Sequence, residues 1–369
     1  MKVDGKNYRG IELKDDLKTL QIIDQTLLPH QFVLKDLTTC DEVIYSINQM
    51  QVRGAPLIGV TAGYAMYLAT LEAQNASNFD RYVSGKAKLL KASRPTAVDL
   101  FKAVDLQLGN ILQSESALEK INVAYTTAIS INYKTLEMCK LIGKFGLPLI
   151  EEISRKKRGQ TVNILTHCNA GWLATVDYGS ATAPIYQAFD KGIKIHVWVD
   201  ETRPRNQGAS LTAWELAKHG VPNTLIADNT GGHLMQHKMV DLVITGTDRT
   251  TANGDVANKI GTYLKALAAD DNGIPFYVAA PSSSIDFRLE DGIKNIPIEQ
   301  RSADEVKYVY GMDNDRYTKV MICTPETACV NYGFDVTPAR LITGLITEKG
   351  ICKANKDDIS FLFNGYRKR

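Results

Sequence analysis

From Val162 onward the chain alternates between short apolar runs and helical segments. The apolar runs have the length and residue types of β-strands, and segments of about 10 to 15 residues with helical spacing separate them. Strands that are apolar on both faces and joined through helices form a parallel sheet covered on both sides. We therefore predict a Rossmann-like α/β domain with a mostly parallel sheet. The predicted strands are "VNILTHC", "IKIHVWVDE", "NTLIAD", "MVDLVITGTD", "IPFYVAAP" and "KVMICTP".

The helical segments between these runs include "TAPIYQAFDKG", "GASLTAWELAKHG" and "DVANKIGTYLKALAADDNG". The preceding basic segment, "SRKKRGQ", marks the point where the pattern changes. A run of like charges is most simply explained as a solvated surface loop.

The first third of the chain has a different pattern. Three short runs, "NYRGIEL", "LKTLQIID" and "HQFVLKDL", predict a small antiparallel sheet. Helical spacing follows, with Thr39 or Asp41 as the N-cap, and the helix restarts after "RGAP". Further helices are expected over "PTAVDLFKAVDLQLGNIL" and from about Glu119 to Ser154. We predict a small N-terminal α+β domain over residues 1–130 and the Rossmann-like domain over 131–369.

The charge balance argues against nucleic acid or acidic membranes as partners. The chain carries 43 basic and 41 acidic side chains, a net charge of +2, so no strong field attracts either. No apolar stretch approaches the roughly 18 residues of a membrane span, and the first residues are too polar for a secretory signal. The six cysteines lie without CxxC spacing, which is typical of reduced cytosolic thiols. We expect a cytoplasmic protein that acts on a small molecule.

Polar and small residues follow every predicted strand, where ligands bind in open parallel sheets. No single residue identifies the site; the concentration of such residues does. These strand ends are Thr166–Asn169, Asp200–Pro204 with Gln207 and Gly208, Asp228–Gly232, Gly246–Arg249 and Pro281–Ser284.

Sequence signatures of common cofactors are missing. The loop after the first Rossmann strand, "CNAGWLATVDYGSATA", lacks the G-x-G-x-x-G spacing of dinucleotide folds, and no Walker motif occurs. His233 and His237 have the i, i+4 spacing of a helix face, but no HExxH pattern or cysteine partner accompanies them. We predict surface histidines, no metal and no cofactor.

Cys168 and Asp248 are the candidate chemical groups, and each has two interpretations. A thiol at a strand end near N–H groups and cations has a lowered pKa and acts as acid, base or nucleophile, whereas a free cysteine is also a common core residue. Burial would raise the pKa of Asp248 and make it a proton donor, whereas aspartate also caps turns. We expect His167 to pack beside or tune this pair.

Arginines beside predicted helix starts are candidates for phosphate binding. "VRGAP" places Arg53 and small residues at a helix N-terminus, where backbone can approach an anion. "SRPTA" places Arg94 before Pro95, which suits the first helical position. The guanidinium matches phosphate bidentately, although surface salt bridges are the commoner role of any one arginine.

Six motifs together resemble the 5-methylthioribose-1-phosphate isomerases, aldose–ketose isomerases of methionine salvage that are related to the regulatory subunits of translation initiation factor 2B. The similarity runs in order from about Tyr8 to Pro338. The motifs are "RGAPLIGVTAGYA", "RPTAV", "ILTHCNAGWLAT", "DETRPRNQGASLTAWEL", "GTDRTTANGDVANKIGTY" and "FDVTPARLI".

This resemblance implies a cofactor-free isomerisation of 5-methylthioribose 1-phosphate by a homodimer. Its catalytic pair falls on Cys168 and Asp248. The implied substrate contacts are Arg53, Gly54, Ala55, Arg94, Gln207, Asn258 and Lys259. One departure is Thr247, where the family commonly has alanine.

Two alternatives stay open at this point. Ribose 1,5-bisphosphate isomerases share the cysteine and the aspartate, but they would need a second cationic cluster, and "IIDQTLLP" fits the methylthioribose enzymes better. A non-catalytic regulatory subunit would lack the pair, which is present here. The order of hydrogen transfer, as a proton through Cys168 or as a hydride, is also open.

Overall fold

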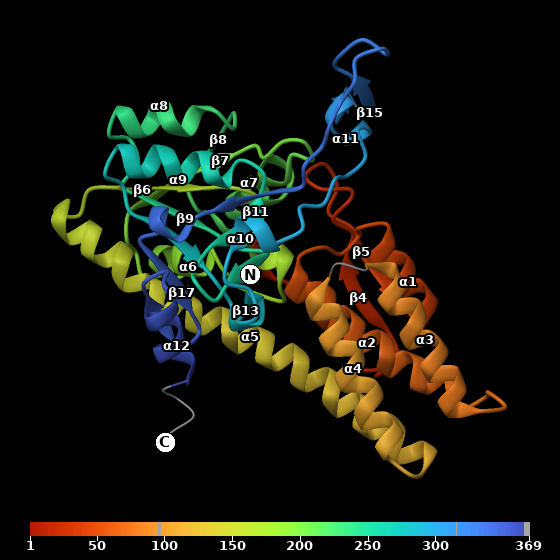
Figure 1. The fold of residues 1–369 in the computed structure, drawn as a ribbon. Coiled ribbons are helices and arrows are strands. Elements are labelled where there is room, and N and C mark those ends of the chain that lie inside the picture. The colour runs from red at the N-terminus through yellow and green to blue at the C-terminus, as the bar shows by residue number, and fades with distance from the viewer. Residues whose placement is uncertain (95–96, 315, 365–369) are drawn as a thin grey trace. The chain divides into compact units, whose positions relative to one another are not determined.

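The computed structural model describes residues 1–94, 97–314 and 316–364 (Figure 1). These residues form two compact units. The first contains Met1–Cys139 and Gly171–Gly179, and the second contains Lys140–Ala170 and the described residues from Ser180 onward. One helix, α5 (Ala117–Lys156), contributes to both units. The predicted division into folding domains at residue 130 stays a prediction.

The first unit contains the predicted antiparallel sheet. Its strands β3 (Ile11–Leu13), β4 (Leu20–Ile23) and β5 (Leu34–Leu37) pair in sequence order, and a hairpin of β1 (Lys2–Val3) and β2 (Lys6–Asn7) precedes them. Four helices follow before α5: α1 (Cys40–Asn48), α2 (Ala55–Ala73), α3 (Phe79–Ser93) and α4 (Val98–Gln113).

The helix starts in this unit follow local chemistry. Thr39 caps α1, as one of the two predicted N-caps, and forms a capping box with Glu42. Gly54 precedes α2 at φ +88°, and a Cβ there would lie 2.5 Å from the Ala174 carbonyl oxygen, so only glycine fits. Arg94 ends α3, and α4 starts at Val98. The helix start predicted at Pro95 is on residues 95–96, outside the described residues.

The second unit is built on a seven-stranded sheet in the order β18-β17-β12-β9-β6-β7-β8, parallel except for β18. The first five predicted strands are confirmed. The sixth, "KVMICTP", is wrong: the next parallel strand is β17. The strands are β6 (Val162–Thr166), β7 (Ile195–Asp200), β8 (Asn223–Ile226), β9 (Leu242–Thr245), β12 (Phe276–Ala279), β17 (Gly344–Thr347) and β18 (Gly350–Cys352).

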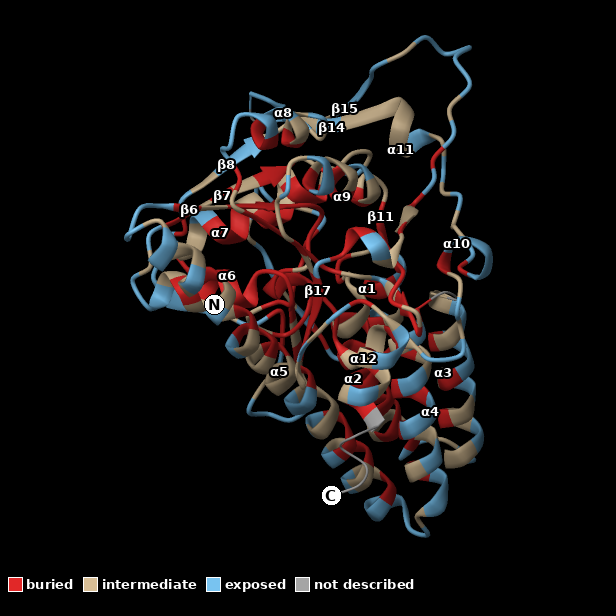
Figure 2. Ribbon diagram, turned by 60° about the vertical axis from the view of Figure 1, so that its left-hand side comes forward, coloured by how far each residue is buried: buried red, intermediate tan, exposed pale blue. Residues whose placement is uncertain are grey.

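Helices cover both faces of this sheet. One apolar cluster joins Leu165 and Val243 of the sheet to Leu234, Ala266 and Ile359, from helices α8 (Thr230–Gln236), α9 (Thr262–Asp271) and α12 (Lys356–Asn364). On the second half of α5, a Cβ at residue 146 would meet Pro184 of α6 (Ala183–Asp190) and Ile346 of β17. Figure 2 shows buried residues concentrated along β6, β7 and β17.

A second sheet has the order β13-β10-β11-β16. Its strands are β10 (Arg249–Thr251), β11 (Val256–Lys259), β13 (Ile285–Asp286) and β16 (Phe334–Thr337). The start of "DVANKIGTY" is therefore strand and not helix, which corrects the prediction. Antiparallel bonds to β10 and β16 determine this conformation.

The remaining elements are short. A hairpin of β14 (Tyr308–Asp313) and β15 (Arg316–Met321) contains the first three residues of the segment mistaken for a parallel strand (Figure 1). Two four-residue helices, α10 (Gly292–Asn295) and α11 (Asp304–Lys307), precede it. The "SRKKRGQ" segment is mostly exposed as predicted, but α5 continues through Lys156 before the turn begins. Among the described residues, no helix combines the length and apolarity needed to cross a bilayer.

Candidate active site

The strand order creates a switch point between β6 and β9. From β6 the chain proceeds to β7 and β8 on one side of it, and β9 then pairs with β6 on the other side. Loops diverge at such a point, and open α/β sheets bind their ligands there. Cys168 follows β6, and Asp248 follows β9. The two predicted catalytic residues therefore follow the two strands that define the switch point.

Cys168 is held in an unusual conformation. Its φ is +66°, in the left-handed region that non-glycine residues rarely occupy. Its N–H donates to the Thr202 hydroxyl over 2.8 Å, and its carbonyl oxygen accepts from the Thr212 hydroxyl over 2.6 Å. The thiol lies 3.7 Å from Oε1 of Gln207, which joins two of the predicted site residues. Core filling alone does not require this strain, so the geometry favours the chemical interpretation.

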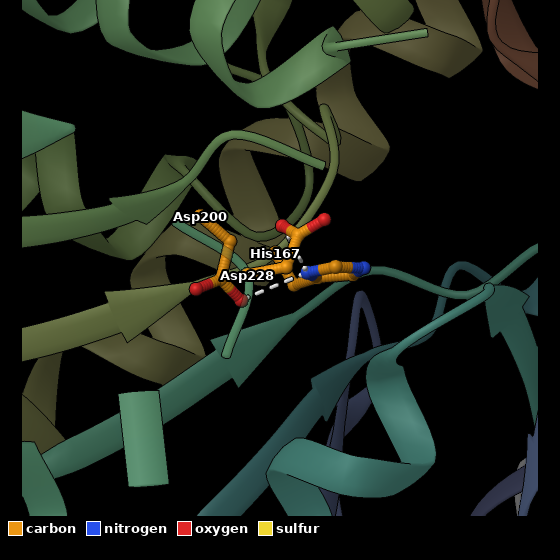
Figure 3. Close-up of side chains that lie close together, drawn as sticks. All are labelled: His167, Asp200 and Asp228. Carbon is orange, nitrogen blue, oxygen red and sulfur yellow. Dashed lines mark hydrogen bonds and ion pairs between the residues drawn. The ribbon is translucent and has the colours of Figure 1, made fainter. Parts of the chain in front are cut away.

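His167 is fixed at both ring nitrogens. Nδ1 lies 2.8 Å from Asp200 Oδ2 (Figure 3). Nε2 lies 2.8 Å from the Ile260 carbonyl oxygen. A carbonyl only accepts, so Nε2 carries a hydrogen. Both side chains of the His167–Asp200 pair are fully buried, and burial raises the pKa of Asp200. A ring with both nitrogens engaged inside the protein supports the site and does not act as its base.

Asp228 and Lys265 lie beside the His167–Asp200 pair and form a cluster of four polar side chains with it. Asp228 accepts the N–H groups of Thr202 and Arg203, each over 2.7 Å. The Lys265 ammonium lies 3.2 Å from Asp200 Oδ2 and donates to the Asp228 carbonyl oxygen. Sequence inspection marked the strand ends with Asp200 and Asp228, but no local signal identifies Lys265, which reaches the cluster from α9.

His167, Asp200 and Asp228 have the ligand types of a metal site. One atom from each lies within 4.8 Å of the others, and Figure 3 shows the three side chains gathered together. However, the imidazole nitrogens and the Asp228 carboxylate already have protein partners, and Lys265 supplies a cation to Asp200. The donor set does not fit an ion, and the predicted absence of a metal stays a prediction.

Asn258 and Lys259 end β11 and are buried. The Asn258 amide donates to the Thr262 hydroxyl over 3.0 Å, and the Lys259 ammonium lies 4.9 Å from the ring centroid of Phe334. Asp335 shapes the following turn by accepting the N–H of Gly261 over 2.7 Å. Burial raises the pKa of that carboxyl.

The burial of Asp248 differs from the prediction. The side chain is exposed, and not buried as predicted. Its backbone N–H donates to Ala257 O over 2.9 Å, which fixes the loop to β11. Thr247, the departure from the family pattern, places its hydroxyl 3.1 Å from that of Thr250.

The remaining predicted contacts belong to the first unit. Arg53, Gly54 and Ala55 form the start of α2, where Gly54 is the N-cap residue. Arg94 is the C-cap residue of α3.

The arrangement is that of a Rossmann-like α/β protein with a constrained thiol at the switch point of its sheet. A family model described as the initiation factor 2 subunit family matches residues 51–354. The chain therefore belongs to this family.

Its similar relatives include enzymes. The chain is 55% identical over 98% of its length to the methylthioribose-1-phosphate isomerase of Desulfatibacillum aliphaticivorans, of which it covers 99%. It is 53% identical over 97% of its length to the protein of that name from Sulfurimonas denitrificans, again covering 99%. The family resemblance seen in the six motifs is confirmed.

Solved structures show the same similarity. The 5-methylthioribose 1-phosphate isomerase of Pyrococcus horikoshii matches with a TM-score of 0.86 and 36% identity, over 98% of this chain and 97% of that one. A structure named translation initiation factor eIF-2B, subunit delta, from A. fulgidus matches with a TM-score of 0.83 and 34% identity, over 97% and 100%.

Proposed function

We propose that this chain converts 5-methylthioribose 1-phosphate into 5-methylthioribulose 1-phosphate. The observation that carries the proposal is the strained Cys168 at the switch point, in a chain that matches proteins named for this reaction over nearly their whole length. The chemistry is an intramolecular oxidation and reduction, in which C1 is reduced as C2 is oxidised.

The substrate's phosphate prevents the usual aldose route. C1 carries a phosphate ester, so the sugar cannot open by losing an anomeric hydroxyl proton. Asp248 instead gives a proton to the ring oxygen as the C1–O bond breaks. Cys168 removes the C2 proton, which leaves an enediol-type intermediate, and returns a proton to C1 while the C2 hydroxyl proton goes back to Asp248.

The exposed position of Asp248 constrains this scheme. A carboxyl that donates a proton near neutral pH needs a pKa above its ordinary value. A sugar bound over Asp248 would exclude water and raise that pKa. Substrate binding thus supplies the desolvation that the surrounding protein does not.

Buried Lys259 is suited to the phosphate. A buried ammonium is unfavourable without an anion, and among the described residues no carboxylate oxygen lies within 4.0 Å of Lys259. We assign it to the phosphate together with Arg53, Gly54, Ala55 and Arg94. Gln207 and Asn258, both buried amides, are assigned to the ring hydroxyls.

The fate of the C2 hydrogen distinguishes two routes. A proton carried by Cys168 can exchange with solvent, whereas a hydride that shifts directly from C2 to C1 does not. A reaction run in D₂O and followed by NMR should place deuterium at C1 of the product. Deuterium at C1 excludes the hydride route, in which Cys168 only stabilises charge, whereas complete retention fits that route or return of the same proton by Cys168.

The protein is further proposed to act as a cytoplasmic homodimer without metal, cofactor, nucleic acid or membrane. The near-zero net charge supports the choice of a small-molecule partner. Oligomerisation through the second unit follows from the family resemblance.

The decisive assay offers both sugar phosphates to the purified protein. We expect turnover of 5-methylthioribose 1-phosphate and at most weak turnover of ribose 1,5-bisphosphate. Turnover of only the bisphosphate would overturn the substrate assignment. The similarity to the A. fulgidus protein supports a regulatory, non-catalytic role as the second candidate, and that role predicts no turnover of either sugar.

A further inference from the structure

Two threonine hydroxyls from one segment bind the backbone of Cys168. The segment runs from the end of β7 through the π-helical turn η2 (Gly208–Thr212). Thr202 accepts the Cys168 N–H over 2.8 Å, and Thr212 donates to the Cys168 carbonyl oxygen over 2.6 Å. Both peptide groups of Cys168 are thereby fixed by threonine side chains that were not among the predicted site residues.

The directions of these hydrogen bonds are determined. A hydroxyl has one hydrogen, and that of Thr202 is donated to the Asp200 carbonyl oxygen over 3.0 Å. Its lone pairs are thus free to accept from Cys168. The Thr212 hydroxyl donates to Cys168 and accepts from the Asn169 amide over 3.1 Å. All these side chains are buried, so water does not compete for the bonds.

The conformation that these bonds maintain is strained at two positions. Cys168 has φ +66° and Thr202 has φ +65°. Such residues cost about 1–3 kcal/mol each and persist only where surrounding contacts enforce them. The strain is severe for Thr202 because its side chain is β-branched. Asp228 enforces it by accepting the N–H of Thr202 and that of Arg203.

The same segment carries Gln207, which contacts the thiol. Gln207 directly precedes η2, and its Oε1 lies 3.7 Å from Cys168 Sγ. A displacement of Thr202 or Thr212 would therefore move the thiol relative to this amide. Misplacing a reacting group by about 1 Å can cost on the order of 10²-fold in rate.

We propose that Thr202 and Thr212 are positioning residues for Cys168, with Asp228 acting through Thr202. Their hydroxyls hold the Cys168 peptide in its left-handed conformation and so aim the thiol. This assignment rests on the proposed role of Cys168 in the isomerisation.

The test compares hydroxyl loss with hydroxyl retention in the full-length protein. Thr202→Val and Thr212→Val keep the shape and remove the hydrogen bonds, whereas Thr202→Ser and Thr212→Ser keep the hydroxyl. We expect each valine variant to lower kcat by about 10- to 100-fold with KM within about 3-fold, and each serine variant to recover most of kcat. Thr337→Val is the matched control, because this threonine is buried and its hydroxyl has no hydrogen-bond partner among the described residues.

A second readout does not depend on turnover. Iodoacetamide labels the free thiols, and mass spectrometry of the peptides follows Cys168 and Cys352 separately across pH. The valine variants should shift the rate and pH profile of Cys168 labelling and leave those of Cys352 unchanged. If wild-type protein turned over neither sugar, the proposed function would fail, but this labelling result would still decide whether the threonines position the thiol.

Two outcomes would overturn the proposal. The first is a folded valine variant with wild-type kcat and wild-type Cys168 labelling. The second outcome concerns Asp228→Asn and applies if both valine variants fail to fold. This variant weakens the hydrogen bond that holds the Thr202 N–H, so it should lower kcat and shift Cys168 labelling in the same direction. Unchanged kcat and unchanged labelling in Asp228→Asn would reject the assignment.

Discussion

Cys168 and His167 are neighbours in sequence with different environments. The imidazole is bonded to Asp200 and to a backbone carbonyl, while the thiol faces Gln207 at the strand end. Only the thiol is placed to meet a ligand at the switch point. We therefore propose that Cys168 carries the chemistry and that His167 fixes the loop that holds it.

Substituting the two proposed catalytic groups tests this division. Cys168→Ser and Asp248→Asn should each lower kcat by about 10²- to 10⁴-fold or more, because each removes an acid–base group. Both variants should fold, since the changes are nearly isosteric. Steady-state assays and circular dichroism measure the two effects. Cys352→Ser is the control, because this half-buried thiol ends the antiparallel strand β18 and pairs with Leu345 near the start of β17. Near-normal activity in either test variant would reject its assigned role.

Individual site residues could be predicted from the sequence where the end of a strand determines their position. Cys168, Asp200 and Asp228 follow predicted strands, so the topology of a parallel sheet places them at one edge. Lys265 and Thr212 could not be found this way, because helix packing and a π-helical turn bring them to the site. The expected burial of Asp248 was wrong because sequence does not reveal how far a loop leads from its strand.

At the scale of elements, the contact between β7 and η2 depends on one glycine. A Cβ at Gly208 would lie 1.7 Å from the Asp200 carbonyl oxygen, which no side chain can occupy. Gly208→Ala should therefore displace η2, lower the free energy of unfolding by about 3 kcal/mol or more and abolish turnover.

Urea unfolding and activity assays check this prediction. Gly232→Ala in α8 is the matched control, because its Cβ would lie 3.7 Å from the nearest atom, in ordinary contact. Alanine at that helical position should preserve or raise stability. Equal unfolding midpoints for the two variants would show that η2 does not need the close approach.

Five of the six strand predictions in the parallel sheet are confirmed, including the partly exposed β8, and the sixth is wrong. Continuous apolar runs identified β6, β7, β9 and β12. The segment containing β15 is also apolar, but it pairs only with β14 and is largely exposed. β11 was mistaken for helix because its residues continue into α9, whereas pairing with β10 and with the distant β16 makes it a strand. The pairing with β16 is long-range and has no local signal.

An ionic cluster joins the segment after β7 to α11, and it should make stability depend on pH. Glu305 binds Arg205 over 2.9 Å and Arg301 over 2.7 Å. Despite the opposing effect of burial, these guanidinium groups lower the pKa of Glu305 from 4.5 to about 2. A carboxyl whose pKa is lower in the folded state stabilises the fold above its unfolded pKa and loses that contribution as the pH falls.

Glu305→Gln should therefore destabilise the protein most near neutral pH. We expect the difference in unfolding free energy from wild type to shrink as the pH falls from about 5 toward 3. Urea titrations at several pH values measure it. Glu299→Gln is the control, since this more exposed carboxylate lies 3.2 Å from Arg301 alone and should show a smaller effect. A difference that stayed constant with pH would mean that the charge of Glu305 does not matter.

For the whole molecule, the β14–β15 hairpin is notable for its exposed apolar side chains. Isolated two-stranded hairpins are marginal in water, and contiguous exposed apolar side chains mark interaction surfaces. This hairpin, in the unit through which the family resemblance implies dimerisation, exposes Tyr310, Met312, Tyr317, Val320 and Met321. A second copy of the chain could cover this surface. The nearly balanced charge, +2 in total, produces only weak repulsion between two copies.

Light scattering after size-exclusion chromatography should give a mass about twice the 40.8 kDa of one chain. Replacing Tyr310 and Val320 together by serine should shift the protein toward monomer, because it removes apolar area from the contact. Phe361→Ser in α12, which removes a more exposed aromatic ring, controls for a general loss of surface apolarity. A monomeric wild type would reject the dimer, and a dimer that persists in the double variant would place the contact elsewhere on the second unit.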